Sequence, residues 1–202
     1  YEEGLLTKED TGGLDLRFGN VEAMLTLIEQ IAFRQGVGDL LAEGVARAAE
    51  KIGKGAEKFA MHVKKQELPM HEPRGKKSLI LAYAVSPTGA DHMENPHDGD
   101  FASYSPAMKN VAQLGFIEPV EAFDLSYRKV RQFLYLQKIW SLYNSLGVCT
   151  FVATPVYTLT FDKLVEAVEA ATGWTTSLWE LLKVGERADT MARCFNVREG
   201  FT

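Results

Sequence analysis

Two pairs of histidine and aspartate lie close together in the middle of the chain, Asp91-His92 and His97-Asp98. An imidazole titrates near neutral pH, so such a histidine can accept or donate a proton, and a neighbouring carboxylate can orient its ring. Two imidazoles and two carboxylates can also ligate a metal ion. A solvated polar loop has the same composition, so three interpretations stay open: an acid–base catalyst, a metal site and a surface loop.

Cys149 closes a segment in which a helix is expected to end at Gly147. Glycine lets the backbone turn sharply, and such a turn can bring N–H groups and a thiolate toward one ligand. The alternative is a glycine that only ends the helix, followed by a buried cysteine, because cysteine is among the most buried residue types. We expect the second cysteine, Cys194, to belong to the core, and we assign no role to His62.

A third motif places an arginine between a proline and a glycine, in Pro73-Arg74-Gly75. A guanidinium held there could bind a phosphate or a carboxylate through two parallel hydrogen bonds. The alternative is an ordinary surface turn with an ion pair, and the residues alone do not separate the two.

The composition excludes several classes of protein. The chain has 202 residues, 22 of them basic and 27 acidic, and a formal net charge of −5, whereas nucleic-acid-binding proteins usually carry a basic patch. Two cysteines cannot staple a disulfide scaffold or hold a four-thiolate metal site by themselves. No apolar run reaches the roughly 18–20 residues that a membrane helix needs. We therefore expect a cytoplasmic globular protein with no nucleic-acid or membrane partner and, because the chain begins at Tyr1, a piece of a longer protein.

Helices must position the candidate residues, because hydrophobic residues recur at helical spacing along most of the chain. Asn20 is a good N-cap for the first helix, and Gly147 is a good terminator for the longest one. The apolar run 79–85 suits either a buried helix or a buried strand, and we favour a helix because no other strong strand signal gives it a partner. The predicted helices cover residues 21–34, 40–52, 79–85, 119–145, 161–172 (with Thr160 as N-cap) and 176–198, the last as one or two helices.

Two irregular segments separate these helices. Residues 62–78 mix charges with prolines, with a short extended stretch within 61–68, and residues 86–119 form a long loop of the kind that is often functional. We expect an all-α, multi-helical fold with two small helical subdomains, 1–85 and 86–202, that together form one compact unit. The inner face of the long helix is expected to carry Phe123, Tyr127, Val130, Phe133, Leu134, Ile139, Leu142 and Tyr143.

Several stretches, taken in their order and spacing, resemble one family, the tungsten-containing aldehyde ferredoxin oxidoreductases. The whole chain resembles the helical C-terminal half of these enzymes. The resembling stretches are Asp39–Gly44 (DLLAEG), Glu67–Pro69 (ELP) with Pro73–Gly75 (PRG), Tyr83–Pro87 (YAVSP) running to Gly89–His92 (GADH), Asn144–Cys149 (NSLGVC), and Gly185–Arg187 (GER) running to Phe195–Val197 (FNV).

The resemblance implies an oxidoreductase that converts aldehydes to carboxylic acids and passes the electrons to ferredoxin. Its cofactor would be tungsten (or molybdenum) held by two molybdopterin-type dithiolenes, beside a 4Fe–4S iron–sulfur cluster. An N-terminal domain of the same protein would supply the seat for the cofactor, and this chain would enclose it and form the substrate channel. We expect the chain to be inactive alone and to bind neither cofactor nor cluster, and we leave a homodimer open.

The resemblance also implies roles for particular residues. Cys149 matches the fourth cluster ligand, the other three lying upstream of this chain. Asn144, Gly147 and Val148 fall in the pterin-binding motif D-x-x-G-L-C, where Asn144 replaces the first aspartate and keeps one hydrogen-bond acceptor. His92 matches the catalytic histidine near the metal, and Glu94 stands where some members carry a basic residue.

Two weaker expectations complete the resemblance. Residues 10–15 (DTGGLD) have the form of the family's other pterin motif, but they stand directly before the cap of the first helix, so we interpret them as a turn. Phe101, Tyr104 and Phe151 are expected to line the aldehyde channel.

Two alternatives from other functional classes stay open. A non-redox helical binding module predicts that Cys149 is buried among aliphatic side chains and far from His92. A mononuclear metal hydrolase would use His92 and His97 with Asp91 and Asp98. The family resemblance instead predicts that Cys149 and His92 face one open, concave surface.

Overall fold

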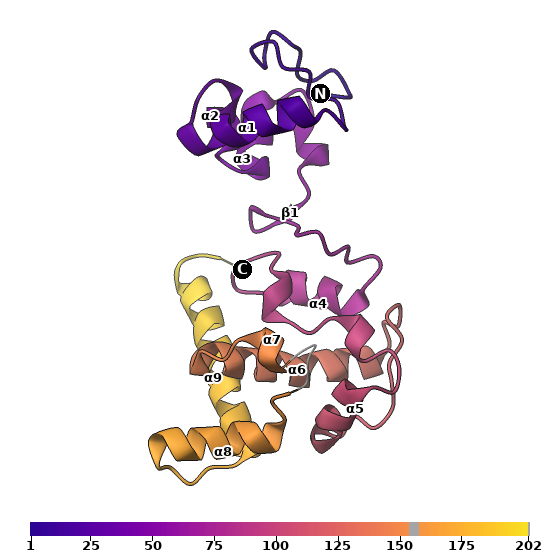
Figure 1. Ribbon diagram of the computed structural model, residues 1–202, viewed down its shortest axis with the longest axis vertical. Coiled ribbons are helices and arrows are strands. Elements are labelled where there is room, and N and C mark those ends of the chain that lie inside the picture. Colours follow the sequence, from indigo (N-terminus) through magenta and orange to yellow (C-terminus); the bar gives the residue numbers. More distant parts are fainter. Residues whose placement is uncertain (154–157, 202) are drawn as a thin grey trace. The chain divides into compact units, whose positions relative to one another are not determined.

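The computed structural model describes residues 1–153 and 158–201 and divides the chain into two compact units, Tyr1–Leu68 and Pro69–Thr202 (Figure 1). Helices dominate both units. Within the described residues the only strands are β1 (His62–Val63) and β2 (Gln66–Glu67), an antiparallel pair in the expected extended stretch. The all-α class is therefore confirmed. No helix of the described part is long and apolar enough to cross a membrane.

The first unit contains three short helices and one 3-10 turn. Asn20 caps the first helix as expected, because its Oδ1 accepts the N–H of Ala23 at 3.2 Å. The elements are α1 (Val21–Phe33), α2 (Val37–Leu41), α3 (Val45–Ile52) and η1 (Ala56–Phe59).

The helix expected over 40–52 is in fact two helices, since α2 ends at Leu41 and α3 begins after its N-cap Gly44. This glycine has φ +86°, a conformation that L side chains rarely adopt. The Glu67 carboxylate, from β2, accepts the N–H of Val45 at 2.6 Å and so supplies the start of α3. A distant side chain therefore sets a helix boundary that local spacing did not show.

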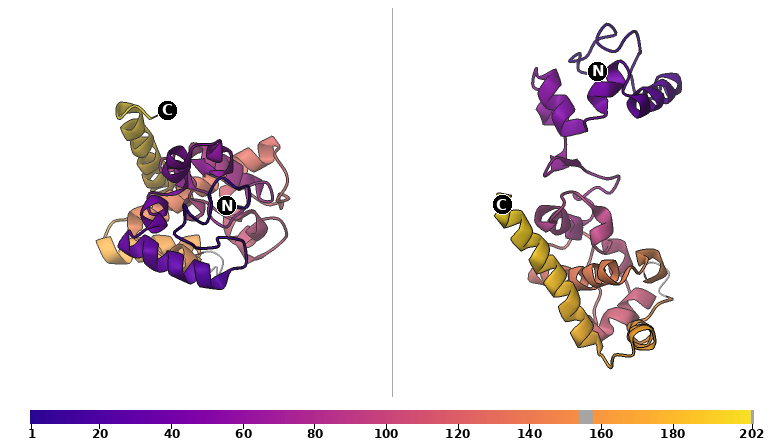
Figure 2. Two further views of the ribbon diagram at one scale, coloured as in Figure 1. Left: turned by 90° about the horizontal axis from the view of Figure 1, so that it is seen from above. Right: turned by 90° about the vertical axis from the view of Figure 1, so that its left-hand side faces the viewer.

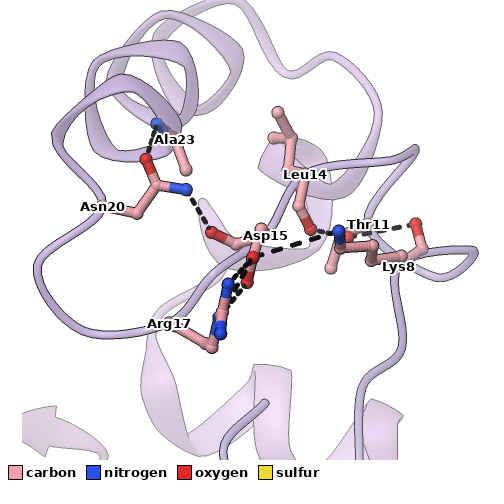
Figure 3. Close-up of polar contacts among 7 residues, drawn as sticks. All are labelled: Lys8, Thr11, Leu14, Asp15, Arg17, Asn20 and Ala23. Carbon is pink, nitrogen blue, oxygen red and sulfur yellow. Dashed lines mark hydrogen bonds and ion pairs between the residues drawn. The ribbon is translucent and has the colours of Figure 1, made fainter.

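The turn expected at residues 10–15 is confirmed, and its own side chains hold it in place (Figure 3). Thr11 is buried, and its hydroxyl donates to the carbonyl of Leu14 at 2.6 Å. The carbonyl of Asp15 accepts from Asn20 Nδ2 at 2.8 Å, which ties the turn to the cap of α1. Local hydrogen bonds thus account for the polar residues of this motif.

The second unit contains the remaining helices. The run 79–85 is helical, as favoured, and Thr160 and Ser177 are N-caps. The region 86–119 is less irregular than expected, because it holds several short helices. The elements are α4 (Lys77–Val85), η2 (His92–Glu94), η3 (Asp98–Asp100), α5 (Pro106–Val111), η4 (Ala112–Leu114), α6 (Tyr127–Leu146), α7 (Thr150–Ala153), α8 (Phe161–Thr172) and α9 (Leu178–Arg198).

The division between the units lies earlier in the chain than the expected boundary after residue 85. Helix α4 packs on α6 and on η2, and it is therefore part of the second unit. The expected boundary falls directly behind α4, inside that unit.

Helix α6 is the centre of the second unit, but its buried face differs from the expected one. It starts at Tyr127 rather than near residue 119, after the N-cap Ser126. Tyr127, Val130 and Leu134 are exposed, as is Phe123 before the helix. The buried face repeats at helical spacing through Lys129, Gln132, Phe133, Leu136, Ile139, Trp140, Leu142 and Tyr143. The expected positions Phe133, Ile139, Leu142 and Tyr143 are confirmed. A search for apolar residues alone missed Lys129 and Gln132 because both are polar.

Helix α9 crosses α6 at close range (Figure 2). A Cβ added at Gly185 would lie 2.0 Å from the carbonyl oxygen of Lys138, so only glycine fits between the two backbones. Ser141 Oγ donates to the carbonyl of Gly185 at 3.0 Å and fixes the crossing.

One buried ion pair joins three elements of the second unit. The side chains of Lys129, on α6, and Asp98, on η3, are both fully buried and bonded to each other. The second oxygen of Asp98 accepts the backbone N–H of Ser78, in the first turn of α4, at 2.9 Å. Since a charge buried without its partner is costly, this pair holds α4, η3 and α6 together.

Replacing Lys129 with methionine is expected to lower the free energy of unfolding of this unit by about 3–5 kcal/mol, because it leaves the Asp98 carboxylate buried and unpaired. The neighbouring control is Arg128→Met, which removes an exposed pair with Glu118 and should cost less than about 1 kcal/mol. All three tryptophans lie in the second unit, so their fluorescence during urea unfolding measures both changes. Equal losses in the two variants would contradict the prediction.

Candidate functional site

A hollow of about 280 Å³ lies in the second unit. Its lining residues come from the segments before and after α4, from α6 and from α7. Three of the four histidines of the chain line it, together with a lysine. Its walls are formed by His71, Lys76, His92, Met93, Asn95, His97, Gly99, Asp100, Trp140, Thr150 and Phe151.

The three imidazole rings are in direct contact. His71 stacks on His92, with ring centroids 4.4 Å apart and an interplanar angle of 24°. His97 stands edge-on to both, at 4.5 Å from His71 and 5.8 Å from His92. His71 is thus the ring closest to both of the others, and His92, the predicted catalytic residue, is stacked against it.

Lys76 fixes the tautomer of His97. Its Nζ lies 3.0 Å from Nδ1 of His97 and 3.5 Å from Nδ1 of His71. An ammonium group can only donate, so Nδ1 of His97 must be the acceptor, and the neutral ring carries its hydrogen on Nε2. The ring of His97 also bonds to the backbone of His92, which links Lys76 to the predicted catalytic residue.

Burial and positive charge keep the neighbouring imidazoles neutral. Burial, followed by the charge of Lys76, lowers the pKa of His97 to about 4. Burial also lowers the pKa of His71, and the proximity of His92 and Lys76 lowers it further. At neutral pH these two histidines are therefore neutral hydrogen-bonding groups.

The two aspartates beside the histidines have structural roles. Asp91 caps η2, because its Oδ1 accepts the N–H of Met93 at 2.7 Å and so shapes the turn that carries His92. Asp98 is used in the buried pair described above. Within the described ranges no group of three or more histidines, cysteines, aspartates and glutamates is arranged to hold a metal ion, so the metal-hydrolase alternative has no support there.

Cys149 follows the end of α6 as the sequence indicated. Gly147 has φ +69°, and the N–H of Val148 donates to the carbonyl of Tyr143 at 2.9 Å, which closes the helix. The cysteine is exposed, so the burial predicted by the helical-binding-module alternative is wrong. The next residues, Thr150 and Phe151, line the same hollow as His92.

Asn144 faces a different hollow, of about 330 Å³, whose walls include Glu94 and Asp189. Glu94 accepts a hydrogen bond from Ser86 Oγ at 2.9 Å. Burial raises the pKa of Asp189 to about 6, and the negative charge of Glu94 adds to this shift while a hydrogen bond from Ser141 opposes it. The structure therefore separates Asn144 from His92 and places it beside Glu94.

Three other sequence expectations have clear outcomes. Arg74 forms a double hydrogen bond with Glu72 and is exposed, which confirms the surface-turn alternative. Phe101 is 2% exposed within the core and Tyr104 is 78% exposed, so of the three aromatic residues expected to line the channel only Phe151 lines the hollow.

Cys194 is exposed, contrary to the expectation that it belongs to the core. The buried positions of α9 are confined to the first part of the helix, Leu181, Leu182 and Gly185. Cys194 lies well beyond them.

Two residues of the hollow, His71 and Lys76, were missed from the sequence. They flank Pro73–Gly75, which drew attention to Arg74 instead. The available signal was that three of the four histidines fall between residues 71 and 97. Only the fold shows that His71 lies against His92 and His97.

Comparison with known proteins defines the class of this helical, histidine-lined structure. The family model described as "Aldehyde ferredoxin oxidoreductase, domains 2 & 3" matches residues 1–202. The chain belongs to the aldehyde ferredoxin oxidoreductase family.

Its relatives carry more than one activity in their names. The chain is 37% identical to a tungsten-containing aldehyde ferredoxin oxidoreductase of Pyrococcus horikoshii, over 99% of this chain and 31% of that protein. It is 32% identical to an aliphatic sulfonate oxidoreductase, WOR-like subunit, of Pyrococcus furiosus, over 93% of this chain and 25% of that protein. The chain thus spans less than a third of the length of these relatives.

A solved structure has the same fold. The active-site complex BamBC of benzoyl coenzyme A reductase, in complex with 1,5-dienoyl-CoA, superimposes with a TM-score of 0.68 at 24% sequence identity, over 99% of this chain and 34% of that chain. At this identity the match shows the fold alone.

The depressed pKa of His97 predicts acid sensitivity. Below pH 6.5 the unfolded chain protonates this histidine, whereas the folded chain does so only near pH 4, so the free energy of unfolding should fall as the pH falls between these values. In His97→Gln this loss should be smaller, as measured by urea unfolding at pH 7 and pH 5. His62→Gln, at an exposed histidine of the other unit, is the control and should keep the wild-type difference. A wild-type difference in His97→Gln would contradict the assignment.

Proposed function

We propose that the whole protein oxidises aldehydes to carboxylic acids, using a bis-pterin tungsten (or molybdenum) cofactor, and passes electrons through a 4Fe–4S cluster to ferredoxin. This chain would enclose the cofactor and form the substrate channel. The observation that carries the proposal is that His92 and the residues directly after Cys149 line one hollow. Family membership supports the same chemistry.

The residues present fit these groups. Cys149 is exposed just beyond the turn at Gly147, so its thiolate is free to ligate iron. Asn144, also exposed, offers an amide that can hydrogen-bond a pterin together with the backbone carbonyls of Gly147 and Val148, whose N–H groups already close α6. One thiolate is only a quarter of a cluster site, so the other ligands and the cofactor seat would come from an N-terminal domain of the same protein.

The bound cofactor would accept the electrons of the oxidation, and the residues of this chain would handle the proton and the substrate. Conversion of an aldehyde and water to a carboxylic acid releases protons as well as electrons, and the imidazole of His92 can accept one of the protons. Stacking against His71 restricts the orientation of that ring. Met93, Trp140 and Phe151 give the hollow apolar walls that suit the body of an aldehyde.

In the intact protein, His92→Gln should lower kcat for aldehyde-dependent dye reduction by about a hundredfold or more, since general acid–base groups contribute roughly 10²–10⁴. His62→Gln is the matched control and should keep wild-type activity. Measured tungsten and iron contents must match in all three proteins, so that the change reflects proton transfer rather than loss of cofactor. Full activity in His92→Gln would contradict the assigned role.

The two exposed cysteines give a matched pair for the cluster assignment. Cys149→Ser should lower the iron content of the intact protein and bleach its iron–sulfur absorption, because the cluster loses one thiolate ligand. Cys194→Ser should leave both unchanged. The isolated chain should bind neither iron nor tungsten in stoichiometric amounts. Stoichiometric iron on the isolated chain would contradict the proposal that the other ligands come from an N-terminal domain. A full cluster in Cys149→Ser would show that Cys149 is not a ligand.

A further inference from the structure

Asn95 is a buried polar residue in the wall of the hollow that contains His92. Its side chain is 2% exposed, and its Oδ1 has no hydrogen-bond partner within the described residues. Buried polar atoms are nearly always bonded, because an atom that has lost water without gaining a partner raises the free energy of the fold. The place of this atom in a cavity wall therefore indicates a partner that enters the cavity.

The backbone of Asn95 is restricted on both sides, so its side chain cannot move far to find a partner in the protein. Asn95 directly follows the 3-10 turn η2 as its C-cap, and Asp91 caps the other end of that turn. The backbone angles of Asn95, φ −150° and ψ 156°, are extended, the conformation that a following proline favours, and Pro96 follows it. One short, fixed turn thus carries both Asn95 and His92.

The rest of the wall suits an uncharged ligand with an aromatic body. Met93, Trp140 and Phe151 are its apolar members, and aromatic rings pack favourably against tryptophan and phenylalanine. Lys76 and Asp100 line it as well, so the wall carries side chains of both signs and does not favour one sign of ligand charge. The volume of about 280 Å³ is close to the lower end of ordinary small-molecule sites, roughly 300–1,000 Å³.

We propose that the hollow selects aldehydes that carry a hydroxyl group on an uncharged body, and that the amide of Asn95 recognises this hydroxyl. A hydroxyl both donates and accepts, so it pairs with Oδ1, and with Nδ2 if the amide turns over. A methyl group in the same place leaves the amide unpaired, and a site with such a hydrogen bond discriminates against the analogue that lacks it. The inference rests on the proposed function, because it names the class of aldehyde used at the same site.

Stability distinguishes an amide that faces a ligand from an amide that holds the fold. Asn95→Leu replaces an unpaired amide with an apolar group of similar shape, so the free energy of unfolding should stay the same or rise. The matched control is Asn110→Leu, which should lower it, because Oδ1 of Asn110 accepts the backbone N–H of Phe161 at 3.2 Å. Urea unfolding of the 202-residue chain, followed by tryptophan fluorescence, measures both. A loss in Asn95→Leu as large as in the control would show that the fold itself uses the amide, and the proposal would fail.

Binding is measured without turnover, with benzyl alcohol and ethylbenzene as probes of similar shape and different polarity. Each is titrated into the 202-residue chain and followed by NMR of the Asn95 side-chain amide and the His92 imidazole. Asn95→Leu should shift the ratio of the two Kd values toward ethylbenzene by at least about fivefold, the effect of one hydrogen bond between neutral groups. Asn110→Leu should keep the wild-type ratio. An unchanged ratio in Asn95→Leu, or no saturable binding of benzyl alcohol to the wild type, would overturn the proposal.

In the intact protein the same comparison uses para-(hydroxymethyl)benzaldehyde and para-ethylbenzaldehyde as substrates. The kcat/KM values should favour the hydroxyl-bearing aldehyde, and Asn95→Leu should shift their ratio toward the ethyl compound by at least about fivefold. The meta isomers are measured as well, so that the result does not depend on one position of the hydroxyl. Ratios that Asn95→Leu leaves unchanged for both isomers would contradict the assigned role.

The two measurements separate this inference from the proposed function. If the chain prefers benzyl alcohol through Asn95 but the intact protein oxidises no aldehyde, the hydroxyl site stands and the proposed function fails. If aldehydes are oxidised with ratios that do not depend on Asn95, the proposed function stands and the hydroxyl site fails.

Discussion

The second unit depends on one buried ion pair. Lys129 and Asp98 are charged groups without access to water, so each is tolerable only while the other stays in place. The carboxylate also bonds the backbone that starts α4, which extends the constraint from a pair to three elements. His97 directly precedes Asp98, so the same constraint fixes the point at which the histidine-bearing segment meets the core.

In the wall of the hollow, by contrast, the hydrogen-bond partners of a lysine are imidazole rings. Asp98 balances one lysine completely, whereas Lys76 faces imidazoles whose pKa values are held down. A protonated imidazole beside that ammonium would be repelled, and partial burial makes the repulsion stronger. The Lys76 ammonium and the imidazoles of His71 and His97 therefore form one hydrogen-bonded group in the wall of the hollow.

The sequence predicted much of the fold for local reasons and missed what depends on contacts between distant residues. Asn20, Thr160 and Gly147 mark helix ends through their own chemistry, and all three were predicted. Gly44 was not, because Glu67 completes that boundary from a strand. The inner face of α6 was predicted at its second half, whereas the buried Lys129 was missed, because only the fold reveals its partner. For the site, His92 and Cys149 followed from the resemblance to a family; His92 lines the hollow, and Cys149 directly precedes Thr150 and Phe151, which line it too. His71 and Lys76 gave no comparable signal, because their role comes from a chain reversal around α4.

The same frame can serve different reactions, because the structural and the ligand-facing residues are separate. The relatives include proteins named for aldehydes and for sulfonates, and a structure with the same fold holds a dienoyl-CoA. In this chain Asp98 and Asp91 point into the structure and hold the segment 91–98, while His92, Asn95 and His97 line the hollow. Substitutions at the second set change the chemistry offered to a ligand without breaking the buried pair. The helical frame is therefore what the family shares, and the side chains of this short segment, together with Lys76, form much of the wall of the hollow.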